Sequence, residues 1–175
     1  EQYIKQFQDQ NPSGFLEATL TEMLKSNVTS RQIWTLSAII LKNHLKEKSH
    51  DSKKIWFELG KDLKTNAIRH LITSTTTPQK SAPAAALLGI IFGLDIDHQE
   101  IKDHIKELLD QAAEKDHHSK FSAIYCLLCI LHRLQELKIE KLDLAKSTFE
   151  SLLAALRELN PENVDDLTHK VLQEL

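Results

Sequence analysis

Apolar side chains recur along this chain at the three- and four-residue spacing of an α-helix, in segments separated by short polar stretches. The clearest stripe consists of Ile101, Ile105, Leu108, Leu109 and Ala112. The pattern predicts the end of one helix in residues 1–10, with Ile4 and Phe7 as its apolar positions. It then predicts further helices over residues 12–26, 29–47, 51–75, 81–94, 97–113, 116–136, 140–159 and 161–175.

Capping signals predict where most of these helices begin. Proline is tolerated in a first turn, and Ser, Asn and Asp side chains accept hydrogen bonds from the first free N–H groups. Asp97 and Glu100 have the spacing of a capping box. The other predicted start signals are Asn11-Pro12, His50-Asp51-Ser52, Ser81 followed by Pro83, Asp116, and Asn160-Pro161.

The predicted helices form consecutive pairs with a period of roughly 40 residues, which is typical of HEAT and armadillo repeats. In such proteins antiparallel helix pairs stack into an α-solenoid. Residues 121–134 are apolar nearly all round, which indicates contact with neighbours on several sides. An irregular helical bundle fits the same segments equally well, so the periodicity predicts an all-α fold and leaves these two architectures open.

Composition agrees with a helical globular protein. The 175 residues include only 4 Gly and 4 Pro, and the hydrophobic and charged contents of 41% and 27% are ordinary. The formal net charge of −3 argues against a nucleic-acid partner, which usually selects a basic surface. No apolar run approaches ~18 residues, so we expect no membrane span. The chain begins at Glu1 without an initiator Met, and we expect it to be a fragment of a longer protein.

The side chains that often carry chemistry are present without the spacing that chemistry needs. Cys126 and Cys129 form a C-x-x-C in the middle of a predicted helix, where we expect two small hydrophobic residues rather than a redox pair. The pairs His117-His118 and His98 with His104 lack the i, i+4 spacing of a helical metal site. We therefore predict no catalytic residue, cofactor or metal, and no enzyme.

Small and polar residues in a particular order carry a family resemblance. The run Ala38-x-x-Leu41-Lys42-Asn43-x-Leu45 is followed by a long helix with Trp56, Asn66, Arg69 and Leu71, by the small-residue run of residues 81–90, and by Asp95-Ile96. In this order the chain resembles the N-terminal HEAT-repeat region of the importin-β (karyopherin-β) family. The resemblance covers about residues 15–135, and residues 136–175 follow it only by helix pattern. Three positions depart from the family pattern: Trp34, Leu36 and Pro83.

The resemblance implies one N-terminal domain over residues 1–175, a right-handed α-solenoid of about four HEAT repeats. It implies a nuclear transport receptor that binds the small GTPase Ran in its GTP form through its inner B helices and takes part in nuclear import of cargo proteins. In the full-length receptor, importin-α or cargo and Phe-Gly nucleoporins are further partners, bound mainly at later repeats. The implied location is the cytoplasm and nucleus, with passage through the nuclear pore, and neither a membrane nor a nucleic acid is an implied partner.

Helix position selects candidate partner-binding residues among the polar side chains of the second helices. They are Lys42, His44, Gln79, Lys80, His117, Lys120, His132 and Arg133. We expect Lys42-Asn43 to close the helix of residues 29–47, whose apolar side we take to be Ile33, Leu36, Ile40, Leu41 and Leu45. Two other functions stay open: a generic HEAT scaffold that never binds Ran, and a helical regulatory subunit of an enzyme complex.

Overall fold

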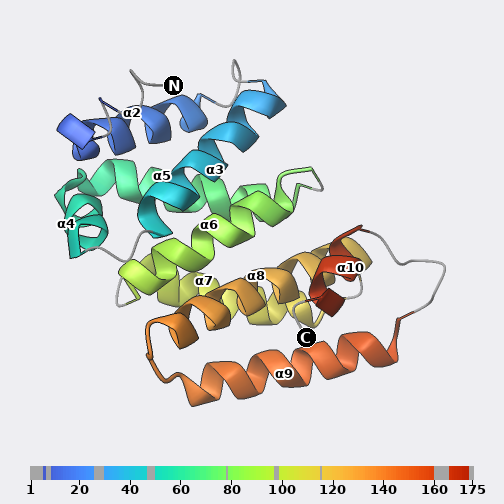
Figure 1. The fold of residues 1–175 in the computed structure, drawn as a ribbon. Helices are drawn as coiled ribbons and strands as arrows, with labels where there is room; N and C mark the ends of the chain where they lie inside the picture. The colour runs from blue at the N-terminus through green and yellow to red at the C-terminus, as the bar shows by residue number, and fades with distance from the viewer. Residues whose placement is uncertain are drawn as a thin grey trace. The chain divides into compact units, whose positions relative to one another are not determined.

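The fold is all-helical in a computed structural model that describes residues 6, 9–25, 30–46, 50–77, 79–96, 99–114, 116–159 and 166–173 (Figure 1). This confirms the all-α part of the predicted fold. The helices are α2 (Pro12–Leu24), α3 (Arg31–Lys46), α4 (His50–Glu58), α5 (Lys61–Thr75), α6 (Ser81–Leu94), α7 (Gln99–Ala112), α8 (His117–Glu136), α9 (Leu142–Arg157) and α10 (Asp166–Gln173). Ile4 and Phe7 lie outside the described residues.

The chain forms two compact units, Glu1–His70 and Leu71–Leu175. In the first, α2 packs on α3, and α4 contacts both of them. Its core contains the fully buried side chains of Leu16, Leu20, Trp34 and Trp56. The Ser13 hydroxyl donates a 2.7 Å hydrogen bond to the Glu58 carboxylate, which links the start of α2 to the end of α4.

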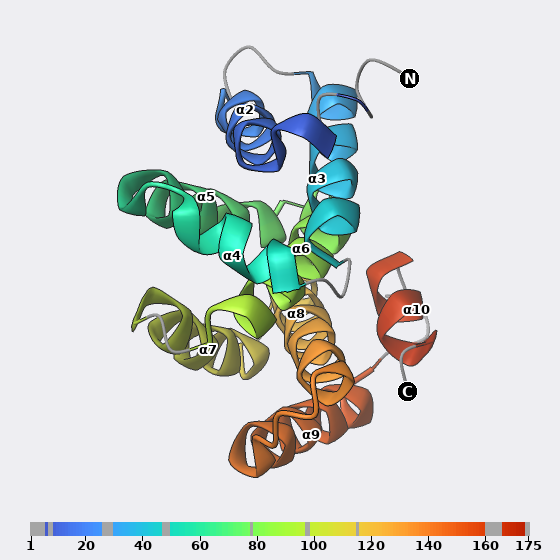
Figure 2. The ribbon, with the colours of Figure 1, turned by 60° about the vertical axis from the view of Figure 1, so that its left-hand side comes forward.

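The second unit is organised around α8, which packs against α6, α7, α9 and α10 (Figures 1 and 2). A helix that is apolar on nearly every side needs such neighbours, because each exposed apolar face would otherwise remain in water. The prediction for residues 121–134 is therefore confirmed. Two contacts also join like members of successive helix pairs, since α7 packs on α9 and α8 packs on α10.

One helix boundary was predicted wrongly. Residues 51–75 form two helices, α4 and α5, that are separated at Leu59 and Gly60. Gly in a helix interior costs about 1 kcal/mol relative to Ala, because its backbone loses the most conformational freedom. The break leaves the Leu59 side chain buried.

The structure tests three of the predicted start signals. The Asn11 carboxamide accepts a 3.0 Å hydrogen bond from the Gly14 amide, and the Asp116 carboxylate accepts a 2.8 Å hydrogen bond from the Ser119 amide, so both predicted caps are confirmed. Ser81 is not a cap. Its own amide already donates to the carbonyl of Thr77, so it is the first helical residue, and Lys80 takes the cap position without a side-chain cap hydrogen bond.

Three predicted start signals are not tested. The described part of the chain does not include the side chains of residues 50–52 or those of Asp97 and Glu100. It also does not include the pair Asn160-Pro161. Pro83 does lie in the first turn of α6, as predicted.

Close packing of α6 on α8 depends on glycine. A Cβ atom at Gly89 would lie 2.7 Å from the carbonyl oxygen of Cys129, and a Cβ atom at Gly93 would lie 2.7 Å from Cγ of Arg133. The first of these neighbours is backbone and cannot rotate away. The expectation that these two glycines mark close helix packing is confirmed.

We predict that Gly89→Ala lowers the free energy of unfolding by about 1–3 kcal/mol, because α6 and α8 must separate to admit the methyl group. Gly60→Ala is the matched control, since a Cβ atom there meets nothing within 4 Å and no glycine has a positive φ in the described residues. Chemical denaturation monitored by circular dichroism measures both variants. Equal stability of the two variants would contradict the assignment of Gly89 to a packing constraint.

Candidate protein-binding surface on α3

The sequence of α3 divides the helix into a buried side and an exposed side. Trp34, Ala38, Leu41 and Leu45 follow the i, i+4, i+7, i+11 spacing and are almost completely buried. The indole Nε1 of Trp34 donates a 2.9 Å hydrogen bond to Nε2 of His70. These contacts set the rotation of α3 within the first unit.

Two residues that we placed on the apolar side of α3 are exposed instead. Leu36 is 57% exposed and Ile33 is 46% exposed, and the neighbouring Ile39 is 41% exposed. The stripe that begins at Trp34 is buried in place of the predicted one, because it brings the largest side chain of the helix into the core. The expected closure at Lys42-Asn43 is also wrong, because α3 continues to Lys46.

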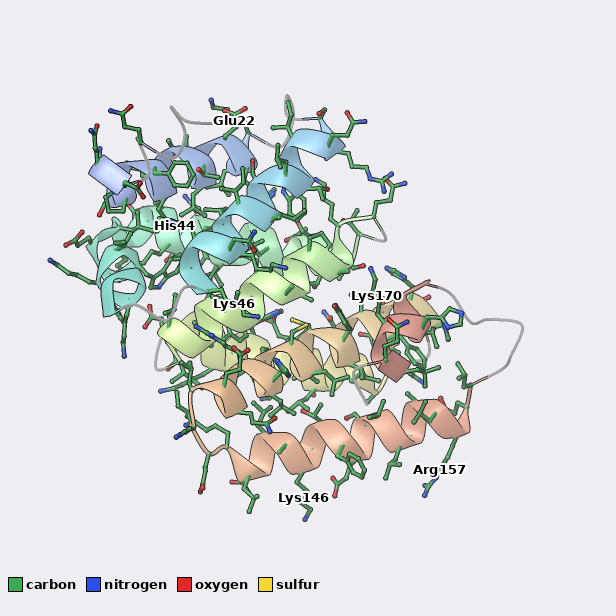
Figure 3. The ribbon with its side chains drawn as sticks, viewed as in Figure 1. Glu22, His44, Lys46, Lys146, Arg157 and Lys170 are labelled. Atoms are coloured by element: carbon green, nitrogen blue, oxygen red, sulfur yellow. The ribbon has the colours of Figure 1, made fainter. Side chains whose placement is uncertain are left out.

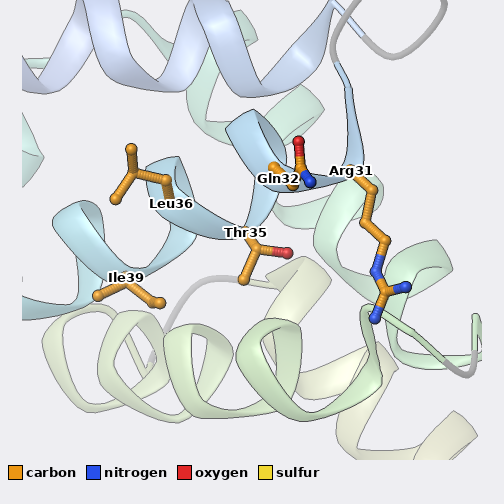
Figure 4. Close-up of a pocket in the computed structure, with 5 residues that line it drawn as sticks. All are labelled: Arg31, Gln32, Thr35, Leu36 and Ile39. Carbon is orange, nitrogen blue, oxygen red and sulfur yellow. The ribbon is translucent and has the colours of Figure 1, made fainter.

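Together these side chains form what we call the α3 surface: Ile33, Leu36 and Ile39 with Arg31, Gln32 and Thr35. Five of them, all except Ile33, line an open pocket of about 600 Å³ (Figure 4). The helix contains no Asp or Glu, although it carries Arg31, Lys42 and Lys46. Figure 3 shows Lys46 near the end of the helix. The α3 surface is thus mainly apolar, and its one charged side chain, Arg31, is cationic in a chain whose net charge is −3. Such a surface suits a partner that combines apolar and acidic groups.

Three of the eight candidate residues are buried. The His44 ring packs edge-on against Phe15 with 5.3 Å between ring centroids. Lys120 forms a hydrogen-bonded ion pair with Glu158, and this hydrogen bond lowers the pKa of the Glu158 carboxyl. Arg133 forms a 2.7 Å ion pair with Glu136. These three side chains contribute to packing within their units.

The other five candidates differ in how far they reach solvent. His117 is half-buried, 3.1 Å from the Thr168 hydroxyl, and its ring lies 4.6 Å from that of Phe121. Lys42 and Lys80 are half-buried, while Gln79 and His132 are exposed. The structure brings together His132 and Arg133, which share Glu136 as an ion-pair partner.

The C-x-x-C cysteines are not placed for redox chemistry. Cys126 is fully buried in the middle of α8, and burial raises the pKa of its thiol well above the usual value, with a smaller contribution from the neighbouring Cys129. Neither cysteine takes part in a disulfide. This agrees with the prediction of two small hydrophobic residues, since the thiolate is the reactive form.

The described part of the chain contains no group of three or more His, Cys, Asp or Glu side chains that could hold a metal ion. His104 is buried in α7, and His98 lies outside the described residues. No helix in the described ranges is long and apolar enough to cross a bilayer. No protein-family model, curated protein or solved structure matches the chain.

Sequence reasoning selected polar residues and missed the exposed apolar ones. Ile33 and Leu36 were assigned to packing because they lie in an apolar helix. The spacing from Trp34 to Leu45 already contained the opposing signal, because a helix buried through that stripe must turn Leu36 toward solvent.

His104 supplies a pH-dependent prediction. Burial lowers the pKa of its imidazole, and Glu107, whose carboxylate lies 3.3 Å from Nδ1, opposes this only in part. The unfolded chain, with an ordinary pKa of about 6.5, then binds more protons than the folded chain at lower pH. The stability that the uncharged His104 imidazole contributes is fully present above the unfolded pKa of about 6.5. It is lost as the pH falls from there through the lowered pKa of the folded protein.

His104→Met should therefore flatten the fall in the free energy of unfolding between pH 7 and pH 5, by at most about 1.4 kcal/mol per pH unit. Urea denaturation at a series of pH values measures the slope. His169→Met, which removes an exposed imidazole, is the control. A wild-type slope retained in His104→Met would refute this role for His104.

Proposed function

We propose that this chain is the N-terminal part of a nuclear transport receptor. Its helix pairs are HEAT repeats of a right-handed α-solenoid, and their second helices bind Ran in its GTP form during nuclear import. Cargo or importin-α and Phe-Gly nucleoporins would bind other repeats of the complete receptor, which would work in the cytoplasm and nucleus and at the nuclear pore. The proposal starts from the sequence resemblance, and two features of the structure support it.

The first supporting feature is the packing of like helices in the second unit. The predicted pair α7–α8 is followed by the predicted pair α9–α10, with α7 against α9 and α8 against α10. The first residues of α7 and α9, Gln99 and Leu142, are 43 positions apart. Contacts between corresponding helices of successive pairs at this period are what a stack of HEAT repeats requires.

The second feature, the α3 surface, carries the proposal. The run of residues 38–45 carries part of the resemblance to the importin-β family. Its apolar residues Ala38, Leu41 and Leu45 are on the buried side of α3. Their role is therefore to seat the helix, and in doing so they present Leu36 and Ile39 on the opposite side. An exposed row of large apolar side chains of this kind is characteristic of protein-binding sites.

Repeat architecture also suggests how binding is transmitted. Each helix pair in such a stack contacts only its neighbours, so small changes at successive contacts add up to a change in curvature. A partner that grips several second helices favours one curvature and thereby alters affinity at other repeats. The five candidates that reach solvent, Lys42, Gln79, Lys80, His117 and His132, are the polar side chains available for such a grip.

We predict that the chain binds Ran loaded with a non-hydrolysable GTP analogue more tightly than Ran loaded with GDP. Leu36→Glu should weaken the complex with the GTP form about tenfold or more, because it places a charge in an apolar contact. Isothermal titration calorimetry measures both affinities, and circular dichroism checks that the variant is folded.

Phe149→Glu is the matched control, because Phe149 on α9 is also 57% exposed. A charge-matched pair is Lys42→Glu and Lys146→Glu; Figure 3 shows Lys146 on the side of α9 away from α8. Only the α3 variants should lose affinity. Equal affinity of the chain for the GTP and GDP forms of Ran would contradict the proposed Ran binding. A role as a scaffold for another partner would then explain the α3 surface better.

A further inference from the structure

A second pocket lies where the chain turns from α8 into α9. Its volume is about 660 Å³, within the range of ligand-binding pockets in proteins. Its apolar lining residues are Leu131, Ile139, Leu142 and Ala145. Lys138 and Lys141 also line it and place two ammonium groups at the same turn. All of these residues belong to the second unit and none is on α3.

The end of α8 explains how Lys138 reaches this pocket. The Ile139 amide donates to the carbonyl of Leu134 and the Lys138 amide donates to that of Gln135, at 2.9 and 3.0 Å. These two bonds define a Schellman motif, in which the residue after the cap adopts the left-handed conformation. Lys138 occupies that position with φ of 56°.

Glycine would hold this conformation without strain, because it lacks a Cβ atom. Lys138 is the only residue other than glycine with a positive φ in the described chain. A lysine here is therefore a poor choice for stability. What it adds is a side chain that projects from the turn at the edge of the pocket.

Leu142 gives independent evidence that the pocket is a contact site. It is 83% exposed, the highest value among the large apolar side chains of the described residues. A leucine so exposed at the first position of α9 contributes little to the core. Burial against a partner would remove most of its apolar area from water.

The charges at the turn indicate the kind of partner. Glu140 also lines the pocket, between the two lysines, so the turn carries two positive charges and one negative charge. Neither Lys138 nor Lys141 forms an ion pair within the ranges that the structure describes. A pocket lined by apolar side chains and by two lysines is complementary to an apolar side chain flanked by carboxylates.

We propose that the α8–α9 turn is a docking site for an acidic peptide segment that inserts an apolar side chain between Leu131, Ile139 and Leu142. Lys138 and Lys141 pair with the carboxylates on either side of the inserted residue. The site needs no nucleotide and no GTPase. The docking proposal is therefore tested independently of the function proposed for the second helices.

The probe is a fluorescein-labelled peptide of sequence DEDFLDED, titrated with the full chain by fluorescence anisotropy. We expect saturable binding that is lost with the basic peptide KRKFLKRK and with DEDGSDED, which lacks the apolar anchor. Lys141→Glu and Leu142→Ser should each weaken binding about tenfold. Lys170→Glu, a charge reversal on α10, should leave it unchanged (Figure 3).

Lys138→Gly separates a binding role from a structural one. This substitution should raise the melting temperature by about 2–4 °C, because the left-handed strain at residue 138 is relieved. It should also lower the affinity for the acidic peptide about threefold, because one ammonium group is lost. Leu36→Glu should keep full peptide binding, which distinguishes this site from the α3 surface. Equal binding of acidic and basic peptides, or unchanged affinity in Lys138→Gly and Lys141→Glu, would overturn the proposal. So would Lys141-dependent binding to phosphatidylserine vesicles without binding of the acidic peptide.

Discussion

Burial of α8 on several sides is the constraint on which the second unit depends. An amphipathic helix can hide one face against one neighbour, but a helix that is apolar nearly all round needs several. The sequence supplies this helix in residues 121–134, and α6, α7, α9 and α10 cover it. Apolar burial has no preferred direction, so the exact seating of each neighbour depends on shape. At α6 that shape is set by Gly89 and Gly93, which let the two helices come close.

Some polar groups in this unit link one helix to another. The Ser122 hydroxyl on α8 donates to the carbonyl of Thr75 at the end of α5, and Lys120 reaches Glu158 beyond the end of α9. Buried donors and acceptors are costly unless they are paired, so such links favour one arrangement over others. This is also why polar residues chosen by helix position proved a mixed set, in which several face neighbouring helices rather than a partner.

The two candidate surfaces arise in different ways. The α3 surface is the side of the helix that core packing leaves exposed. A helix that buries Trp34 and Leu45 leaves Leu36 and Ile39 in contact with solvent. The α8–α9 pocket arises at a helix end, where Lys138 holds a conformation that glycine would hold more easily. In both places apolar side chains remain in water beside cationic groups, which is a combination that a folded core does not need.

The sequence by itself determined the all-helical fold, most helix boundaries, the Asn11 and Asp116 caps and the position of the C-x-x-C in the middle of a helix. These features depend on local spacing and on hydrogen bonds between near neighbours, which a linear pattern records. Only the tertiary structure decided the break at Gly60, the rotation of α3 and the burial of His44, Lys120 and Arg133. The rotation of α3 and the burial of these side chains depend on which neighbouring helix faces them. Packing against such neighbours overrides a local pattern, because the apolar area at stake exceeds the differences in helix propensity.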